Sequence, residues 1–228
     1  MRLTQETNKG HTTGRRRSRD KRAAASAKHP LLAASTADTQ HHVAILALGV
    51  SIWNRWRASE PLTVPNLQNA DLSGLVLENV NLAGANLRGA DFSGAYLYDA
   101  DFQKANLEKA DLTRAVLIGA NFHGASLVKA SLEHAYIAQS DLSNANLTGA
   151  CLQEADLKMA LLTQTLLSNA SVAAADMAEC IDLTELQLKS ACDGHLAYLE
   201  SATLEDVLED TSVKKAQRNL LAKERVLA

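Results

Sequence analysis

The sequence predicts an all-β solenoid, in which short extended segments coil around a packed axis, and three observations predict it. Residues 65–179 divide into 23 consecutive blocks of five residues without an insertion. The middle residue of every block, called the centre here, is apolar, and the residue two places earlier is Ala in 18 blocks. Aromatic residues make up only 4% of the chain, which argues against a layered core built on large rings. A regular repeat of small and large apolar residues is typical of stacked architectures.

The period of five is the physical reason for a coil. On an α-helix, successive centres would step by about 140° and spread around the whole cylinder, so no face would be buried. In a straight strand, an odd period would send successive centres to opposite faces. We therefore expect the chain to turn after each block, with the Ala and the centre pointing inward and the other three residues pointing outward.

Each coil is predicted to contain four blocks, because the residue before each centre forms four nearly uniform columns when it is read at intervals of 20. The columns contain Asn66, Asn86, Asn106, Ser126 and Asn146; Asp71, Asp91 and Asp111; Val76, Tyr96, Val116 and Tyr136; and Asn81, Asp101, Asn121 and Asp141. Residues 20 apart would then stack at about 4.8 Å, which gives a rod of roughly 28 Å. We expect the stacked Asn side chains to hydrogen-bond to one another, which favours a structural role over ligand binding.

The blocks follow the pattern A-(D/N)-L-x-x and resemble the repeats of the pentapeptide repeat proteins. The resemblance covers residues 65–179, about half of the chain. It implies a right-handed quadrilateral β-helix with short α-helical caps at both ends. An open coil leaves unpaired backbone at each end, so caps are also expected on physical grounds.

The amino-terminal cap is predicted in residues 42–64, as one helix followed by a linker. The helix is expected from His42 to Arg57, before Glu60-Pro61, with an apolar side made of Ile45, Leu48, Ile52 and Trp56. The run Trp53-Asn54-Arg55-Trp56-Arg57 resembles a segment that precedes the repeats in family members.

The carboxy-terminal cap and tail are predicted in residues 180–228. The sequence from Thr184 to Gln187 forms a capping box, which predicts a short helix to about Cys192. Beyond it, a weak helical pattern is formed by Leu204, Val207, Leu208, Leu220 and Leu221.

The charge of the chain is distributed unevenly. Residues 1–64 contain 11 Lys and Arg against 4 Asp and Glu, whereas residues 65–179 contain 6 against 13. Residues 1–41 lack periodicity and are predicted to be a disordered basic arm. Three roles remain open for this arm: a solvated tail, a tether to nucleic acid or anionic membrane, or a targeting peptide.

No catalytic, cofactor-binding or metal-binding residues are predicted, and we expect no enzymatic activity. A filled coil offers no cleft in which an acid, a base or a nucleophile could converge. The pair His41-His42 is too short to define a metal site. Cys151, Cys180 and Cys192 are odd in number and lack metal spacing, which favours reduced thiols in the cytoplasm.

One outer face carries apolar residues where most outward positions are polar, and this face is the candidate partner-binding site. Its residues are Val76, Tyr96, Tyr98, Val116, Ile118 and Tyr136, with Ala138 and Met159 beside them. Contiguous exposed aromatic and aliphatic side chains usually mark a contact surface. The contact could be made by an unknown protein partner, by a second copy in a homodimer, or by the chain's own terminal segments.

These features predict a rigid, non-enzymatic scaffold for protein–protein interaction. The alternative is a DNA mimic, because some family members protect DNA gyrase and topoisomerase IV from quinolones or toxins. Duplex DNA over roughly 28 Å carries about 16 charges. The repeats carry a net charge of −7, under half of that number, and the basic arm opposes mimicry.

Overall fold

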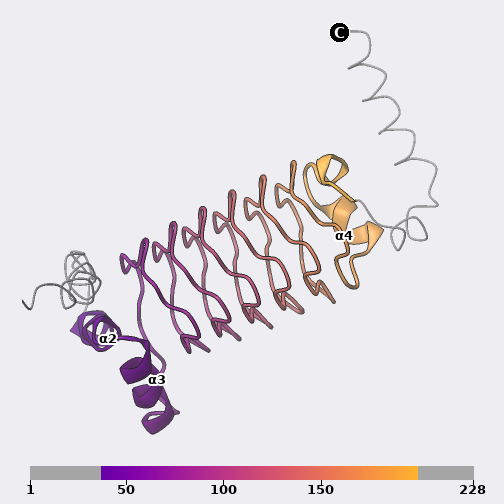
Figure 1. Ribbon diagram of the computed structural model, residues 1–228. Helices are drawn as coiled ribbons and strands as arrows, with labels where there is room; N and C mark the ends of the chain where they lie inside the picture. Colours follow the sequence, from indigo (N-terminus) through magenta and orange to yellow (C-terminus); the bar gives the residue numbers. More distant parts are fainter. Residues whose placement is uncertain (1–36, 200–228) are drawn as a thin grey trace, which may run out of the picture. The chain divides into compact units, whose positions relative to one another are not determined.

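The computed structural model describes residues 37–199 of the chain. Within the repeats, parallel β-bridges join each residue before a centre to the residue 20 positions later, from Asn66 with Asn86 to Leu161 with Ile181. Four successive blocks therefore complete one coil, as the columns predicted, and the coils lie above one another (Figure 1). Each side contributes a single bridge residue rather than a long strand. The right-handed sense of the coil stays a prediction.

Blocks in the inner coils repeat one set of backbone hydrogen bonds. At Asn86, for example, the N–H donates to the Pro65 carbonyl and the carbonyl accepts from the Leu67 N–H, both at 2.8 Å. At the junction of two blocks, the Ala70 N–H donates to the Leu67 carbonyl at 3.1 Å and closes a turn. The coil is thus held by bonds between coils along the sides and by turn bonds at the corners.

The corner residue, two places after each centre, has a positive φ in all 23 blocks, between 51° and 72°. Seven of these corners are Gly, such as Gly84 at 65°, and the other sixteen are occupied by residues with side chains, such as Ala174 at 55°. The left-handed region is unfavourable for residues with a Cβ, so these corners are held by the stacking of the coils.

The axis of the coil is filled by the centres. Leu72, Phe92 and Ile137 are examples of centres with no exposed side-chain surface. Phe102 and Phe122 stack in parallel with ring centroids 4.9 Å apart, and Phe92 meets Phe102 edge-on at 5.8 Å. The small alanines between the centres let the walls approach, so that large side chains fill the interior.

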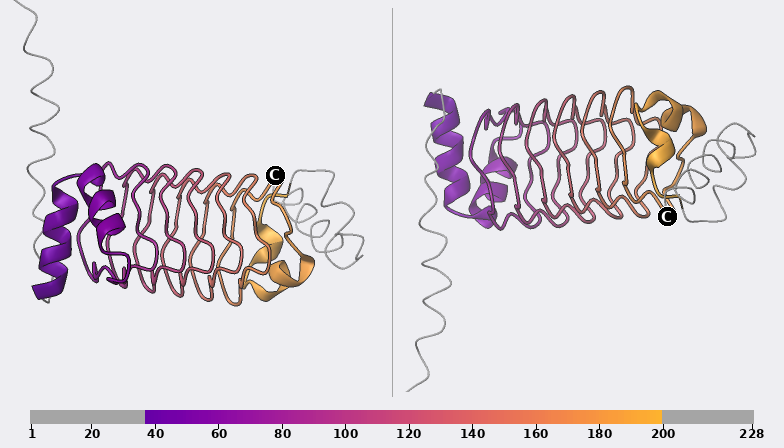
Figure 2. Two further views of the ribbon diagram at one scale, coloured as in Figure 1. Left: turned by 90° about the horizontal axis from the view of Figure 1, so that it is seen from below. Right: turned by 90° about the horizontal axis from the view of Figure 1, so that it is seen from above.

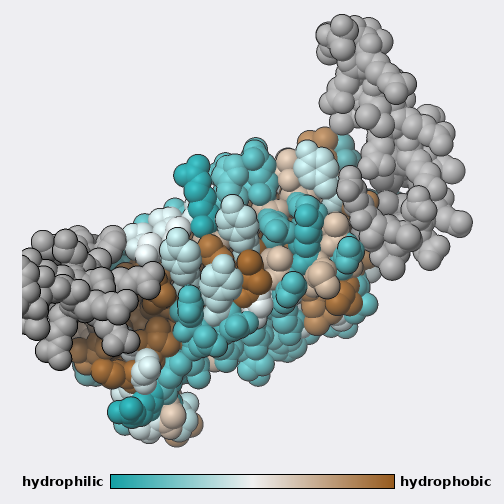
Figure 3. Space-filling view, in the orientation of Figure 1, coloured by the Kyte–Doolittle hydropathy of each residue, from teal (hydrophilic) through white to brown (hydrophobic). Residues whose placement is uncertain are grey.

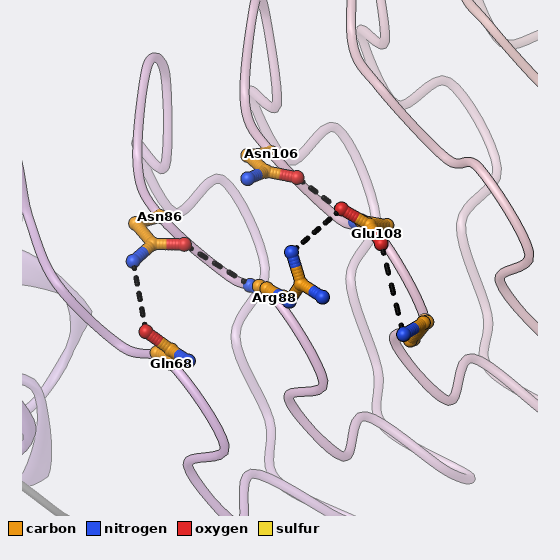
Figure 4. A network of polar contacts seen from close by, with 6 residues as sticks. Gln68, Asn86, Arg88, Asn106 and Glu108 are labelled. Carbon is orange, nitrogen blue, oxygen red and sulfur yellow. Dashed lines mark hydrogen bonds and ion pairs between the residues drawn. The ribbon is translucent and has the colours of Figure 1, made fainter.

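The Asp and Asn residues before the centres stabilise the turns. In all 13 such blocks the side-chain Oδ1 accepts the backbone N–H two residues later, as Asn86 does from Arg88 and Asn106 from Glu108 (Figure 4). The expected ladder of bonds between stacked Asn side chains is reduced to one bond among the described residues, from Asn86 to Asn66 at 3.0 Å. The Asn66 Oδ1 accepts both this bond and its own turn bond, so the side chains serve the turn in all 13 blocks and the stack in one.

The amino-terminal cap consists of two helices, α2 (Ala37–Ala47) and α3 (Val50–Ser59), where the sequence predicted one helix. The break lies at Gly49, whose φ of 111° is incompatible with a helix. As a result, Leu48 and Ile52 are exposed rather than facing the coil. Helix α2 also begins inside the segment that was predicted to be disordered, of which residues 1–36 lie outside the described part of the chain.

Helix α3 closes the first coil with side chains. Trp53, which is fully buried, donates from Nε1 to the Asn81 carbonyl at 2.7 Å. Asn54 Oδ1 accepts the Asn81 N–H at 2.9 Å, and Arg57 donates to the Ala83 carbonyl at 2.7 Å. These backbone groups face away from the second coil, so the cap satisfies an edge that would otherwise remain open.

The carboxy-terminal cap contains helix α4 (Glu185–Ser190) and a 3₁₀ turn, η1 (Gly194–Leu196). The predicted capping box is present, with Gln187 N–H donating to Thr184 Oγ1 and Gln187 Oε1 accepting from the Thr184 N–H, while the helix ends earlier than predicted. The rungs continue beyond residue 179, because Ile181 pairs with Leu161 and Tyr198 pairs with Asp176. Figure 2 shows α2 and α3 at one end of the stack and α4 at the other.

No helix in residues 37–199 is long and apolar enough to cross a membrane. The weak helical pattern predicted after Leu199 lies outside the described residues.

Candidate partner-binding surface

The third column of the repeats places four apolar side chains directly above one another. Val76 pairs with Tyr96, Tyr96 with Val116, and Val116 with Tyr136, all by parallel bridges. Successive members are therefore separated by about 4.8 Å along the stack. Because the residue before a centre and the residue after it both point outward, Tyr98 and Ile118 lie beside this column. The six residues together are called the apolar strip.

The side chains of the apolar strip reach solvent. Val76 is 66% exposed, Tyr136 51%, Tyr96 47% and Tyr98 38%, while Val116 and Ile118 are partly exposed. The structure thus brings all six predicted residues to one face of the repeats. The space-filling view also shows pale and brown side chains among hydrophilic ones on one face of the repeats (Figure 3).

Beyond Tyr136 the same side of the stack becomes charged. Its next two bridge residues are Asp156 and Asp176, and Lys158 Nζ lies 2.8 Å from Asp176 Oδ2. The apolar surface continues instead around the corner, through Met159 at 48% exposure and Ile181 at 52%. Sequence reasoning missed Ile181, although the change from Asp and Asn to Leu161 in the fourth column was a visible signal.

Acidic side chains and one His line the long sides of the strip. On one side, His134 lies between Glu133, with Nε2 to Oε1 at 3.7 Å, and Glu154, with Nδ1 to Oε2 at 3.3 Å. On the other side, Asp99 is exposed, and Glu78 is exposed near the start of the strip. Neither Glu78 nor Asp99 forms an ion pair with another described residue. An apolar centre with charged margins is the usual composition of a protein-binding surface.

A family model for pentapeptide repeats matches the chain in eight copies, over residues 66–98, 95–133 and 125–164. The repeat region belongs to the pentapeptide repeat family. No curated protein gave a match.

Several solved structures of pentapeptide repeat proteins are similar to the chain. Rfr23 of the cyanobacterium Cyanothece 51142 is 24% identical over 56% of this chain and 96% of its own, with a TM-score of 0.47. QnrB1, a plasmid-mediated fluoroquinolone resistance protein, is 21% identical over 62% of this chain and 83% of its own, with a TM-score of 0.33. AT2G44920 from the Arabidopsis thaliana thylakoid lumen is 26% identical over 62% of this chain and 77% of its own, with a TM-score of 0.31.

One group of side chains in the pentapeptide repeats superficially resembles a catalytic triad. His123 Nδ1 lies 2.8 Å from Ser143 Oγ, which donates to Asp141 Oδ1 at 2.5 Å. In a triad the carboxylate orients the His and the His accepts the proton of the Ser, so the order here is wrong. The Ser hydroxyl already donates its hydrogen bond to the carboxylate. These three residues therefore stabilise one another and are not arranged for nucleophilic attack.

Metal-ligating clusters are absent from residues 37–199, and one cysteine in this range is a buried core residue. No group of three or more His, Cys, Asp or Glu side chains in this range could hold a metal ion. The three cysteines are free. Burial raises the pKa of the Cys180 thiol to about 12, and its Sγ donates to the Leu157 carbonyl. Cys180 is therefore an unreactive core residue.

Proposed function

We propose that this protein is a non-enzymatic scaffold whose apolar strip binds a protein partner. The observation that carries the proposal is the stack of exposed Val76, Tyr96 and Tyr136 on one side of a coil whose other columns are mostly polar at their bridge residues. Tyrosine supplies a large contact area with few rotatable bonds, so ordering it in a complex costs little entropy. The repeats hold these side chains at fixed spacing, which reduces the cost further.

The proposal is tested by capturing partners on immobilised full-length protein from extracts of its source organism. A Tyr96→Ser/Tyr136→Ser double variant should reduce the specifically captured protein at least tenfold. The matched control is Leu166→Ser, because Leu166 is 53% exposed in a different column of the stack. Equal capture by the double variant and the wild type, with unchanged circular dichroism, would contradict the proposal. A change in solution mass of the double variant alone would instead identify a second copy as the partner.

The negative charge of the repeats favours a second candidate function, in which the protein binds DNA gyrase or topoisomerase IV as a DNA mimic. Supercoiling by purified gyrase should then change at micromolar concentrations of the protein, with or without a quinolone. An unchanged reaction under both conditions removes this candidate and leaves the scaffold. We also propose that the scaffold acts in the cytoplasm, which the three free cysteines support.

A further inference from the structure

We propose that the apolar strip binds a proline-rich segment in the polyproline II conformation, with a Lys or Arg at one end of that segment. The inference rests on the proposed function and names the chemical class of its partner. Three features of the described residues support it: the backbone bonding of the strip, the spacing of its tyrosines, and the charges around it.

The backbone of the strip is already paired with the neighbouring coils. The Tyr96 N–H donates to the Leu75 carbonyl at 2.8 Å, and the Tyr96 carbonyl accepts from the Leu77 N–H at 2.7 Å. Tyr136 makes the equivalent pair of bonds, at 2.9 and 2.7 Å. A peptide therefore cannot join this wall as an additional β-strand, and only side chains can recognise it. Polyproline II segments are bound in this way by aromatic side chains.

The two tyrosines of the column match the repeat of polyproline II. Tyr96 and Tyr136 both pair with Val116, so they lie two rungs apart, at about 9.6 Å. A polyproline II helix completes one turn of three residues in about 9.3 Å, so residues three positions apart would meet successive tyrosines. An α-helix repeats after about 5.4 Å, and a strand returns to the same face after about 6.6 Å. Neither of these conformations fits the spacing as closely.

Val116 leaves room for a proline ring between the two tyrosines. Valine is much shorter than tyrosine, so the surface is lower above Val116 than above Tyr96 or Tyr136. Within residues 37–199, the rings in contact are Phe pairs in the core and His and Trp in the amino-terminal cap, and no contact joins two tyrosines. The faces of Tyr96 and Tyr136 are therefore available to an apolar ring placed between them.

The tyrosines also offer hydrogen-bond donors. Within residues 37–199, the hydroxyls of Tyr96, Tyr98 and Tyr136 make no hydrogen bond to another residue. Each phenolic O–H can donate one bond. The carbonyls of a polyproline II segment have no donor within the segment and can accept such bonds. The strip thus supplies both the apolar contact and the polar contact that this conformation needs.

The charges around the strip are mostly acidic and favour a basic residue in the partner. The six blocks of the third column, with the two residues before each block, contain two basic residues, Arg114 and Lys158, against seven acidic ones: Glu78, Asp99, Glu133, Glu154, Asp156, Asp176 and Glu179. Lys158 is already paired with Asp176 at 2.8 Å. The attraction for a positively charged segment therefore outweighs the repulsion.

The position of Arg114 indicates which end of the strip meets the basic residue. Arg114 lies two positions before Val116, so it would repel a Lys or Arg at the middle of the strip. Asp156 is the next bridge residue beyond Tyr136, about 4.8 Å further along the stack. We therefore assign the basic residue to the end of the segment that lies beyond Tyr136, beside Asp156 and Glu154.

Fluorescence anisotropy with full-length protein and labelled synthetic peptides tests the proposal. The probe is the peptide PPLPPLPPR, and the controls are AALAALAAR, which lacks the preformed conformation, and PPLPPLPPE, which reverses the charge. A strip of this size predicts weak, transient binding, so the titration should reach about 1 mM protein. We expect PPLPPLPPR to bind at least tenfold more tightly than AALAALAAR and at least threefold more tightly than PPLPPLPPE. Equal affinities for the first two peptides, or no binding of PPLPPLPPR, would overturn the proposal.

The variant Val116→Tyr separates matched spacing from general stickiness. It adds aromatic surface to the strip but fills the low position, so binding of PPLPPLPPR should weaken at least fivefold. The matched control is Val76→Tyr, which adds the same ring at the end of the column and leaves the space between Tyr96 and Tyr136 unchanged, so affinity should stay within twofold. Tighter binding by Val116→Tyr, with unchanged circular dichroism, would overturn the proposal.

The variant Asp156→Asn tests the basic residue. Its side-chain oxygen can still accept the Lys158 N–H, so the turn is preserved. The affinity for PPLPPLPPR should fall about threefold, while that for PPLPPLPPE should not fall. Equal effects on the two peptides would overturn the assignment of the basic residue to this end.

Two further outcomes distinguish this inference from the proposed function. A wild-type mass of two chains that returns to one chain in Tyr96→Ser/Tyr136→Ser would assign the strip to a second copy and overturn the inference. Loss of captured partner in that double variant, without binding of PPLPPLPPR to wild type, would overturn this inference alone. Unchanged capture by the double variant, with PPLPPLPPR bound to wild type, would count against the scaffold proposal and support the peptide site.

Discussion

The first coil and the last coil of the repeats both expose backbone groups that a neighbouring coil would otherwise pair, yet the chain covers them with different chemistry. At the first coil, side chains of α3 cover the edge: Trp53 and Asn54 bond both backbone groups of Asn81. At the last coil, the backbone itself continues, as Tyr198 donates to the Ala175 carbonyl and accepts from the Met177 N–H, and the side chains of Asp193 and Gln187 add further bonds.

The difference shows that an open β edge can be closed with or without matching its register. A backbone cap must follow the spacing of the rungs, so its contribution is spread over many bonds, including those of Ser190 and Cys192. A side-chain cap needs only a few groups of the right reach, so its contribution is concentrated in them. Single substitutions should therefore harm the first end more than the last.

The largest effect is expected for Trp53→Ala. This change removes a fully buried ring and leaves the Asn81 carbonyl without its donor, so the free energy of unfolding should fall by about 3–5 kcal/mol. Denaturant unfolding followed by circular dichroism measures the loss. Ile52→Ala is the matched control, because Ile52 is 41% exposed on the same helix. Similar losses in the two variants would show that α3 is not integral to the stack.

A smaller loss is expected for Asp193→Ala at the other end. Asp193 Oδ1 accepts the Val172 N–H and Oδ2 accepts from Ser171 Oγ, both at 2.6 Å. Losing these charge-assisted bonds should lower the free energy of unfolding by about 2 kcal/mol, because the remaining backbone bonds persist. Asp193→Asn should recover part of the loss, since its amide oxygen can still accept. A loss as large as that of Trp53→Ala would refute the distributed cap.

The corners extend the comparison to the backbone. None of the six corners from Glu154 to Glu179 is Gly, and each has a positive φ. Ala174→Gly should raise the free energy of unfolding by about 0.5 kcal/mol, because relief of the strained φ exceeds the gain in unfolded-state entropy. Gly84→Ala should lower it by a similar amount through strain alone, since a Cβ there meets no atom within 4 Å. Thermal unfolding of both variants decides whether the late coils are strained.

The smallest effect is a pH response confined to the first end. His42 Nδ1 accepts the Asn66 N–H at 3.2 Å, so it must be neutral, and burial together with the neighbouring His41 lowers its pKa below the usual 6.5. The unfolded chain then binds the proton more readily, so this contribution is complete above pH 6.5 and declines as the pH falls towards the lowered value. The thermal midpoint should drop less between pH 7.5 and 5 in His42→Gln than in wild type. An equal drop in the two proteins would contradict this role of His42.

Most of the coil could be predicted from the sequence, because each block repeats the same two requirements. The small residue at Ala85 and the large one at Leu87 can only be inside, and the columns 20 apart fix how the coils stack. The apolar strip followed from the same register. It consists of the outward positions at which apolar residues replace polar ones.

The caps were predicted less well, because neither cap is built from a repeated sequence pattern. Gly49 divides the first cap into two helices, and a single Gly within an apolar helical pattern does not reveal this in advance. The role of Asn54 and Arg57 as partners of backbone groups depends on where α3 meets the coil, which no local pattern encodes. The turn bonds of Asn86 and Asn106 were not predicted, because columns of residues 20 apart indicate stacking between coils and not bonds within a block.

The uninterrupted numbering of the blocks also determines how the strip could change by insertion or deletion. A duplication of twenty residues would add one full turn of the coil and lengthen the protein, while every later side chain stayed on the same wall. A single extra block between Tyr96 and Tyr136 would instead rotate everything after it by a quarter of a turn and separate the two tyrosines onto adjacent walls. The protein can therefore change in length without moving the strip only by whole coils of four blocks.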